Sequence, residues 1–257
     1  MPTEHLVPIQ YYLELGADFL NMNQLLGKKI QLTATGSECL QCHAPKEIYR
    51  QGFCKSCFFE TPNAGAWILR PELSTAHLGI ADRDLAFEQK MQLTPHIVYL
   101  AFSSSVKVGV TRKTQVPTRW IDQGATQALV FVEVPNRYLA GVAEVALKAY
   151  VSDKTNWRKM LQEITTTSDL VALKKELAAF LPEEVQPYLD LNDTAVTTMD
   201  FPVLQYPAKV KSLNLKKQPL YTGVLQGVKG QYLLFDDATV FNVRANEGTV
   251  VRLEVLD

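Results

Sequence analysis

The sequence has no apolar run that approaches the roughly 18 residues needed by a membrane-spanning helix. Its first residues, MPTEHLVPIQ, lack the basic and apolar regions of a secretory signal. We therefore expect a soluble, cytoplasmic protein without a membrane partner. With 257 residues, of which 47% are hydrophobic, the chain is long enough for about two domains with packed cores.

The glycine signatures of common nucleotide-binding and hydrolase folds are also missing. No G-x-x-x-x-G-K-[ST] or G-x-G-x-x-G pattern occurs, which argues against a P-loop or a dinucleotide-binding domain. No G-x-S-x-G pattern occurs either, and the chain has only 4 histidines, so a Ser-His-Asp hydrolase is not expected.

Neither acids nor bases dominate the composition. The formal net charge is −1, so the chain as a whole lacks the positive charge typical of nucleic-acid-binding proteins. The charges are nevertheless unevenly placed, because 163–200 is acidic whereas 89–121 and 201–235 contain no acid. The basic residues of these two stretches are Lys90, Lys107, Arg112, Lys113, Arg119, Lys209, Lys211, Lys216, Lys217 and Lys229. Local basic surfaces can bind phosphates, but solvated faces explain the same charges equally well.

All 4 cysteines fall within 39–57, as two C-x2-C pairs separated by an eleven-residue spacer. Two such pairs can close a tetrahedral zinc shell, so we predict a zinc ribbon with a structural Zn²⁺ held by Cys39, Cys42, Cys54 and Cys57. This closed shell leaves no coordination position for catalysis, and His43 is expected at the surface. Two disulfides are the weaker alternative, because no secretory signal precedes them.

Hydrophobic periodicity and turn residues divide the chain into four segments of an α+β protein. These are an N-terminal region at 1–94 with the ribbon at about 36–60, a core at 95–160, a helical acidic segment at 161–200, and a β-rich C-terminal module at 201–257 that forms a small barrel or sheet. Within the N-terminal region, KKIQLTATGSEC predicts a strand and 82–93 an amphipathic helix. The prolines and glycine of 58–73 predict mostly loop.

The core segment has the predicted element order β-β-α-β-α. Strands are expected at 96–102, 106–112 and 127–134. QVPTRWIDQGA predicts a short helix, and NRYLAGVAEVALKAYVSD a longer one. The expected apolar face of the longer helix is formed by Leu139, Val142, Ala146, Ala149 and Tyr150.

Glu144 lies opposite that face on a helical wheel and is therefore expected to face solvent. The small residues Ala140 and Gly141, one turn earlier, should leave space above its carboxylate.

Several polar residues of the core are out of keeping with simple packing, namely Tyr99, Lys107, Arg119, Glu144 and Asn156. Each alone has an ordinary explanation, such as a core tyrosine, a solvated glutamate or a stacked arginine. Together they resemble the GIY-YIG nuclease superfamily, whose core has the same β-β-α-β-α order. IVY and KVG stand where that family has its two tripeptides, and the resemblance covers about residues 95–158.

The resemblance implies metal-dependent cleavage of DNA or RNA phosphodiester bonds. Glu144 would hold one Mg²⁺ or Mn²⁺, and Arg119 would stabilise negative charge on the phosphate. Tyr99, with its pKa lowered by nearby cations, would activate or orient the attacking water. Lys107 replaces the family's tyrosine and would bring positive charge to the phosphate, and Gly109 would allow close approach of a neighbouring element or the substrate. Nucleic-acid contacts are expected from Lys107, Arg112, Lys113, Asn156 and Arg158.

The wider arrangement resembles domain-of-unknown-function family 2797, an uncharacterised prokaryotic family. Its members pair a four-cysteine segment with stretches like VGVTRKTQVPTRWIDQGA and DKTNWRKML, and the resemblance covers most of the chain. It implies no activity. The leading hypothesis is a nuclease-like protein that uses the ribbon and the C-terminal module as accessory binding surfaces. A non-catalytic zinc-ribbon nucleic-acid-binding module and a protein-interaction scaffold stay open as alternatives.

Overall fold

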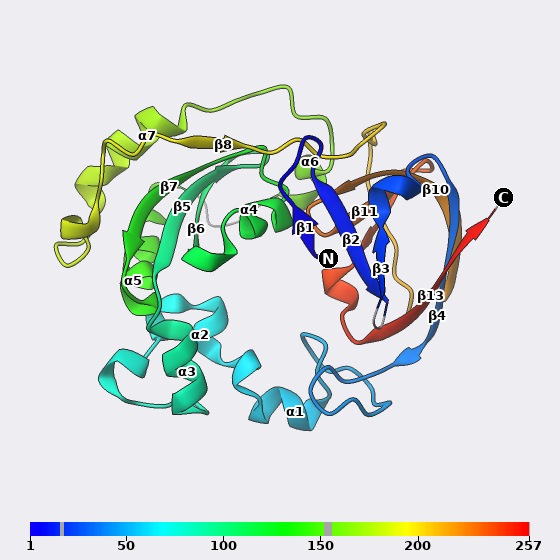
Figure 1. The fold of residues 1–257 in the computed structure, drawn as a ribbon, viewed down its shortest axis with the longest axis horizontal. Helices are drawn as coiled ribbons and strands as arrows, with labels where there is room; N and C mark the ends of the chain where they lie inside the picture. The colour runs from blue at the N-terminus through cyan, green and yellow to red at the C-terminus, as the bar shows by residue number, and fades with distance from the viewer. Residues whose placement is uncertain (16–17, 152–155, 257) are drawn as a thin grey trace.

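A computed structural model describes residues 1–15, 18–151 and 156–256, which form a mixed α+β fold with three β-sheets (Figure 1). The sheets have the strand orders β6-β5-β7-β8, β13-β4-β10-β11-β12-β9 and β1-β2-β3. None of these sheets closes into a barrel within the described residues, so the β-rich C-terminal strands belong to an open sheet. None of the described helices combines the length and apolar character needed to cross a lipid bilayer.

The four-stranded sheet is antiparallel and contains β5 (His96–Phe102), β6 (Val106–Arg112), β7 (Gln127–Val134) and β8 (Val196–Thr198). Its central strand β5 is buried at every residue. Successive side chains of a strand point to opposite faces, so β5 contributes to two cores. Ile97, Tyr99 and Ala101 pack in one, and Val98, Leu100 and Phe102 pack in the other.

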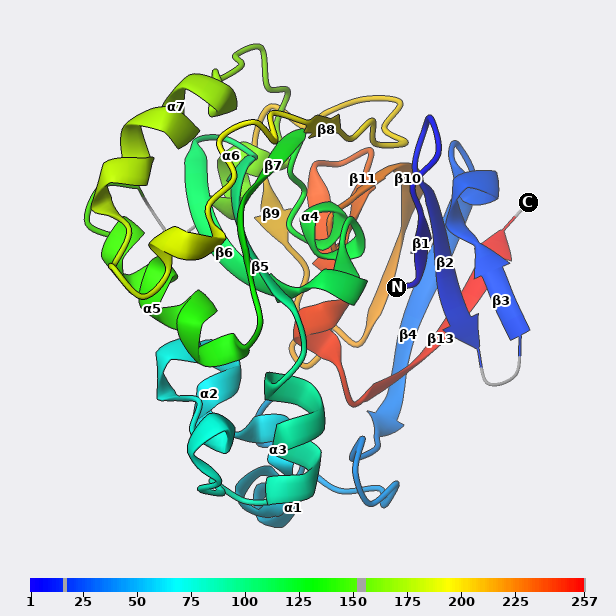
Figure 2. The same ribbon diagram turned by 60° about the vertical axis from the view of Figure 1, so that its left-hand side comes forward.

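Helices cover both faces of this sheet (Figures 1 and 2). On one face lie α5 (Arg137–Leu147) and α7 (Leu170–Leu177), whose buried leucines join the core of Val98 and Leu100. On the other face lies the short α4 (Thr118–Asp122), between the four-stranded and six-stranded sheets. The β-β-α-β-α element order expected for the core is therefore present.

The six-stranded sheet combines strands from both ends of the chain. They are β4 (Lys29–Ser37), β9 (Lys211–Ser212), β10 (Leu220–Lys229), β11 (Tyr232–Phe235), β12 (Thr239–Asn242) and β13 (Thr249–Leu256). β4, the strand expected before the cysteines, lies between β10 and β13 and is antiparallel to both, with Leu32 opposite Tyr221 and Leu253. The smaller sheet contains β1 (Thr3–Glu4), β2 (Gln10–Leu15) and β3 (Asp18–Asn21) and is followed by the 3-10 turn η1 (Met22–Leu25).

The segment after the cysteines was expected to be mostly loop, and this expectation is wrong. It contains a chain of short helical turns: α1 (Lys55–Glu60), η2 (Pro62–Ala64), α2 (Ala66–Leu69), η3 (Pro71–Leu73) and η4 (Ala76–Leu78). Pro62 and Pro71 stand at the starts of η2 and η3. Proline suits the first turn of a helix because that position needs no N–H donor, so these prolines begin turns and do not prevent them. The predicted helix at 82–93 is observed as α3 (Leu85–Gln92).

The buried face of α5 also differs from the expected one. It is formed by Ala140, Gly141, Ala143, Glu144 and Leu147, whereas Tyr150 is 53% exposed. The space at Gly141 is filled by the backbone of η3, since a Cβ at this residue would lie 2.2 Å from the Glu72 nitrogen. Close packing against η3 therefore decides which face of this helix turns inward.

The acidic segment is helical only in short pieces. Besides α7 it contains the 3-10 turns η6 (Ala178–Phe180) and η7 (Gln186–Tyr188). α6 (Trp157–Met160) precedes it, and the remaining 3-10 turns are η5 (Lys113–Gln115) and η8 (Arg244–Asn246). The end of the expected longer helix and the start of DKTNWRKML fall partly on 152–155, outside the described residues. The division of the chain into four segments stays a prediction.

Candidate functional site

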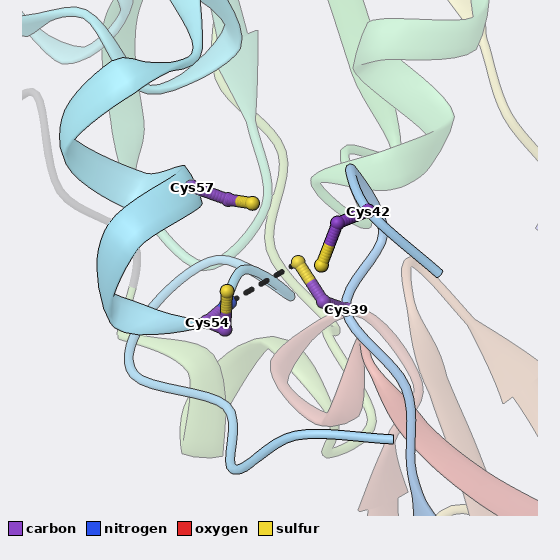
Figure 3. A group of neighbouring side chains, drawn as sticks. All are labelled: Cys39, Cys42, Cys54 and Cys57. Atoms are coloured by element: carbon purple, nitrogen blue, oxygen red, sulfur yellow. Dashed lines mark hydrogen bonds between the residues drawn. The ribbon is translucent and has the colours of Figure 1, made fainter. Parts of the chain in front are cut away.

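The sulfur atoms of Cys39, Cys42, Cys54 and Cys57 all lie within 4.8 Å of one another (Figure 3). All four are free thiols, so the disulfide alternative is wrong for this structure. Two pairs of sulfurs at these separations suit a tetrahedral metal shell, and the cluster is compatible with a structural metal such as zinc. Among the described residues, no other group of three or more Cys, His, Asp or Glu side chains is placed to hold a metal ion.

Backbone donors favour the thiolate form at Cys39, which is the form that binds metal, whereas the hydrogen bond to the Cys54 thiol raises the pKa of Cys57 to about 12. The Cys54 N–H donates to the Cys39 sulfur at 3.3 Å. Burial raises the pKa of the Cys39 thiol, but the N–H groups of Cys42, Cys54 and Gln41 outweigh burial and lower this pKa to about 6. The backbone around Cys39 therefore favours the deprotonated sulfur that a metal ion needs.

The spacer between the two cysteine pairs returns to the first pair, where the Leu40 N–H donates to the Gly52 carbonyl at 2.9 Å. His43 lies at its start, with a 74% exposed side chain and its Nδ1 3.2 Å from the Glu38 carboxylate, so it is the surface residue that was expected. Gly52, at its end, has a left-handed φ of 77°, which glycine adopts without strain. The last part of the spacer, 48–52, lines a cavity beside the four-stranded sheet.

Two adjoining cavities lie beside β6 and α4. The basic cavity, of about 520 Å³, extends towards α5 and includes Arg112, Arg137 and Glu144 in its lining. The second cavity, of about 840 Å³, extends towards α6, β11 and η8 and includes the spacer residues 48–52. We name it the amide cavity after the amide side chains in its lining, which include Asn214 and Asn246. The two cavities share the lining residues Lys107, Arg119, Asp122, Gln123 and Arg244.

Positive charge is concentrated in the basic cavity, although the whole chain has a net charge of −1. Its cationic lining residues are Lys107, Arg112, Arg119, Arg137, Lys148 and Arg244, and its carboxylates are Asp122 and Glu144. Clustered charge of one sign in a cleft raises the local concentration of oppositely charged ligands. The cavity is therefore suited to a ligand that carries phosphate groups.

All four predicted catalytic residues line this cavity, but Tyr99 is not the activated phenol that was expected. Its side chain is fully buried, and its hydroxyl donates to Gln123 Oε1 at 2.9 Å. Burial raises the pKa of this phenol above its ordinary value, and the nearby Arg119 only partly opposes the change. The expected lowering is wrong because the cost of desolvating a phenolate exceeds its attraction to the cation.

Glu144 is buried, with 8% of its surface exposed, so the expected solvent-facing position is wrong. One of its carboxylate oxygens lies 3.3 Å from Lys148 Nζ, one helical turn later. Burial lowers the pKa of the neighbouring Arg137 to about 10, although the charge of Glu144 acts in the opposite direction. Lys148, at the C-terminal cap of α5, therefore already forms an ion pair with this carboxylate.

Lys107 and Arg119 lie at the junction of the two cavities. Lys107 is only 5% exposed, although it belongs to a strand beside two cavities, and Arg119 is half-buried on α4. A ligand that crossed from one cavity to the other would pass both cations.

The predicted nucleic-acid contacts divide into two groups. Lys107 and Arg112 line the basic cavity, but Lys113, Asn156 and Arg158 line neither cavity. Lys113 forms an exposed ion pair with Glu133 at 2.9 Å. The side chain of Asn156 accepts a hydrogen bond from the Lys159 N–H at 3.2 Å and so caps α6, and Arg158 lies over the Trp157 ring at 4.3 Å.

Arg137, Lys148 and Arg244 are cavity cations that the sequence reasoning missed. Arg137 is held by the carbonyls of Trp67 and Ile68 at 3.1 and 2.8 Å. A cation in the first turn of a helix opposes the helix dipole, and this was a signal that could have marked Arg137. Lys148 follows Glu144 by four residues, the spacing of a helical ion pair, whereas Arg244 reaches the cavity from η8 without any local signal.

No curated protein and no solved structure matches the chain. One family model does match it, over residues 27–251, and the family is described as "Protein of unknown function (DUF2797)". This match confirms the family resemblance inferred from the four-cysteine segment and the core stretches. Since it spans most of the sequence, the chain belongs to the DUF2797 family.

Proposed function

We propose that the protein binds the phosphate backbone of a nucleic acid in the basic cavity. The observation that carries this proposal is the placement of six cations against two carboxylates in one cleft of a chain whose net charge is −1. Phosphate contacts supply essentially all of the sequence-independent affinity of proteins for nucleic acid. Arg137 supports the proposal further, because its two backbone acceptors fix the guanidinium in place before any ligand arrives.

The positions of the cations favour a chain of phosphates over a single anion. They extend from Arg112 and Arg137 in the basic cavity, through Lys107, Arg119 and Arg244, which line both cavities, to Arg50 and Lys216 in the amide cavity. A small anion would use only part of this path, whereas consecutive phosphates of one strand would use most of it.

A second candidate function, metal-dependent phosphodiester cleavage, is favoured by the shared location of Tyr99, Lys107, Arg119 and Glu144. Glu144 would hold Mg²⁺ or Mn²⁺. Magnesium is commonly held by one or two carboxylates together with substrate phosphates, so Glu144 would hold the metal only together with phosphate oxygens of the substrate, and the metal would compete with Lys148 for this carboxylate. Such a metal neutralises charge on the scissile phosphate.

The side chains around Glu144 suit distinct roles in that reaction. Arg119 would bind the phosphate oxygens in a bidentate manner that a lysine cannot reproduce. Tyr99 stays a neutral phenol because its pKa is raised, so it would orient the attacking water and would not accept its proton. Lys107 would place its charge beside the phosphate at the cavity junction.

The four cysteines complete the proposal as a structural zinc site. A closed shell of four thiolates leaves no position for substrate. The zinc would join the turn after β4 to the start of α1, and the spacer between the pairs would thereby be held against the amide cavity. Its role would be to brace a wall of the binding site.

The binding proposal is tested by titrating labelled oligonucleotides with the protein at several salt concentrations. We expect affinity to fall steeply with salt, and Arg119→Ala to reduce the slope of log K against log salt by about 1. Lys175→Ala is the matched control, since Lys175 is an exposed lysine on α7 outside both cavities. Absence of binding at low salt, or equal losses in both variants, would overturn the proposal.

The cleavage candidate is tested on a panel of labelled DNA and RNA structures with Mg²⁺ or Mn²⁺. Glu144→Gln removes the charge of the carboxylate and keeps its size, and it should reduce cleavage by about 100-fold or more. Glu176→Gln, on the exposed side of α7, should leave cleavage unchanged. Binding without cleavage by the wild type, or equal cleavage by both variants, would leave binding as the function.

A further inference from the structure

The amide cavity differs in chemistry from the basic cavity because it contains a stacked aromatic pair. The rings of Trp157 and Tyr232 both line it, with centroids 5.7 Å apart and an angle of 6° between their planes. The guanidinium of Arg158 lies over the Trp157 ring at 4.3 Å. Arg158 is exposed at the surface and lines neither cavity.

Amide side chains held by local hydrogen bonds complete this cavity. Asn214 accepts the N–H of Lys216 at 2.9 Å, and Asn246 donates to the Asn242 carbonyl at 2.7 Å. Within the described part of the chain, the side-chain nitrogen of Asn214 has no acceptor and the side-chain oxygen of Asn246 has no donor. A preoriented donor and acceptor in the same cavity as two aromatic rings suit a flat, polar, heterocyclic ligand.

The connection between the cavities places such a ligand next to phosphate-binding groups. Lys107, Arg119 and Arg244 line both cavities. A phosphate bound at this junction would leave its own nucleotide free to enter the amide cavity. The combination of a stacking platform, amide hydrogen-bonding groups and adjoining cations is the combination used to bind unpaired nucleotides.

We infer that the amide cavity binds an unpaired nucleobase, so that the ligand of this protein is a single-stranded nucleic acid or a single-stranded segment of one. This inference rests on the proposed function, because it assumes that the basic cavity binds the phosphate backbone. In a duplex the bases are stacked and paired with one another, and none can enter a side cavity unless it first leaves the stack.

The test compares three labelled oligonucleotides of about 12 nucleotides, a length within the range of single-strand binding sites. They are a single strand, its duplex, and a single strand of the same length in which all bases are replaced by abasic residues. We expect the single strand to bind about tenfold or more tightly than either of the others. Equal affinity for the abasic strand, or duplex binding as tight as single-strand binding, would overturn the inference and leave the proposed function intact. If none of the three binds, the proposed function itself fails.

A substitution at the stack gives a second readout. Trp157→Ala should weaken single-strand binding about tenfold and leave duplex binding unchanged. Tyr150→Ala is the matched control, because Tyr150 is an exposed aromatic residue stacked on Phe180 outside both cavities. Equal effects of the two substitutions would contradict the assignment.

Tryptophan fluorescence of the wild-type protein provides the readout that does not depend on folding of a variant. Trp120 is buried and lines neither cavity, Trp67 is buried but lines the basic cavity, and Trp157 is partly exposed and lines the amide cavity. The single strand should therefore quench the fluorescence more strongly than the abasic strand, which would act only near Trp67. Equal quenching by both strands would argue against a stacked base.

Discussion

Tyr99 and Gly109 lie directly opposite each other on β5 and β6, and the tyrosine ring fills the space that a side chain at Gly109 would need. A Cβ at Gly109 would lie 2.5 Å from the Tyr99 hydroxyl oxygen. The glycine is therefore explained by packing against a neighbouring strand, which was one of its two predicted roles. This contact also directs the phenol towards Gln123, with which it forms its hydrogen bond.

Substitution of Gly109 tests this contact. Gly109→Ala should lower the free energy of unfolding by about 1–3 kcal/mol, because the fully buried Tyr99 ring has no room to move aside. Urea denaturation measures the change. Gly36→Ala, in β4, is the control, since a Cβ there would meet nothing within 4 Å and should alter stability by less than about 1 kcal/mol. Similar stability for both variants would show that the Tyr99 ring moves aside and that the contact is not tight.

Removal of the Tyr99 hydroxyl separates its structural role from its proposed catalytic one. Tyr99→Phe should lower the free energy of unfolding by about 1 kcal/mol through loss of the bond to Gln123. Tyr221→Phe loses a similar bond, to Asp237 at 2.9 Å, and this residue lines neither cavity. If Tyr99 orients the attacking water, only Tyr99→Phe should lose cleavage. Equal cleavage by both variants would restrict Tyr99 to a packing role.

From the cysteine cluster we predict about one bound zinc ion per chain. Elemental analysis of the purified protein measures this zinc content. Cys42 is the exposed member of the cluster, so Cys42→Ser should remove the metal with the least disturbance of packing. We expect a fall of at least about 5 °C in Tm, since 1 kcal/mol corresponds to about 2–4 °C for a chain of this size.

His43→Ala is the control for this metal site. His43 follows Cys42 directly and is exposed, so its loss should leave the zinc content unchanged. A wild-type protein without metal, or full zinc retention in Cys42→Ser, would contradict the prediction.

His96 should make the stability of the protein sensitive to acid. Burial lowers the pKa of this histidine to about 4, and the charges of Arg137 and Arg112 act in the same direction. Its Nδ1 bonds the Thr94 carbonyl at 2.7 Å, and its Nε2 has no hydrogen-bond partner among the described residues. The folded state therefore holds the neutral imidazole.

The direction of this pH effect on stability follows from the pKa values of His96 in the unfolded and in the folded chain. The unfolded chain takes up the proton near the ordinary pKa of about 6.5, whereas the folded chain resists protonation down to about 4. The stabilising contribution is present above about pH 6.5 and is lost as the pH falls towards 4, by about 2 kcal/mol between pH 7 and pH 5. His96→Gln, which cannot titrate, should lack this part of the pH dependence in denaturation experiments. Parallel curves for both proteins would exclude His96 as the cause.

Local sequence determined the elements of the core and the metal site. The observed bounds of β5, β6 and β7 coincide with the predicted strands, because short apolar runs between turn residues have few other ways to bury themselves. The paired C-x2-C spacing likewise predicted one cluster, because each pair needs only its own tight turn and a single further contact.

The orientation of α5 was decided by tertiary contacts. The helix itself carries small and apolar residues on more than one side, so its sequence is compatible with more than one buried face. The close approach of η3 to Gly141 selects the face that contains Glu144. As a result, the carboxylate that was predicted at the surface is buried and paired with Lys148.

Only the tertiary structure placed the two cavities and most of their charges. Arg244 and Lys107 are far apart along the chain but line the same two cavities. They come together because β4 pairs with both β10 and β13, and because α4 packs between the two large sheets. Periodicity within one segment carries no information about which distant segment packs against it. The sequence by itself determined the strands and the cysteine cluster through local chemistry, whereas the combination of basic and amide cavities depended on long-range packing.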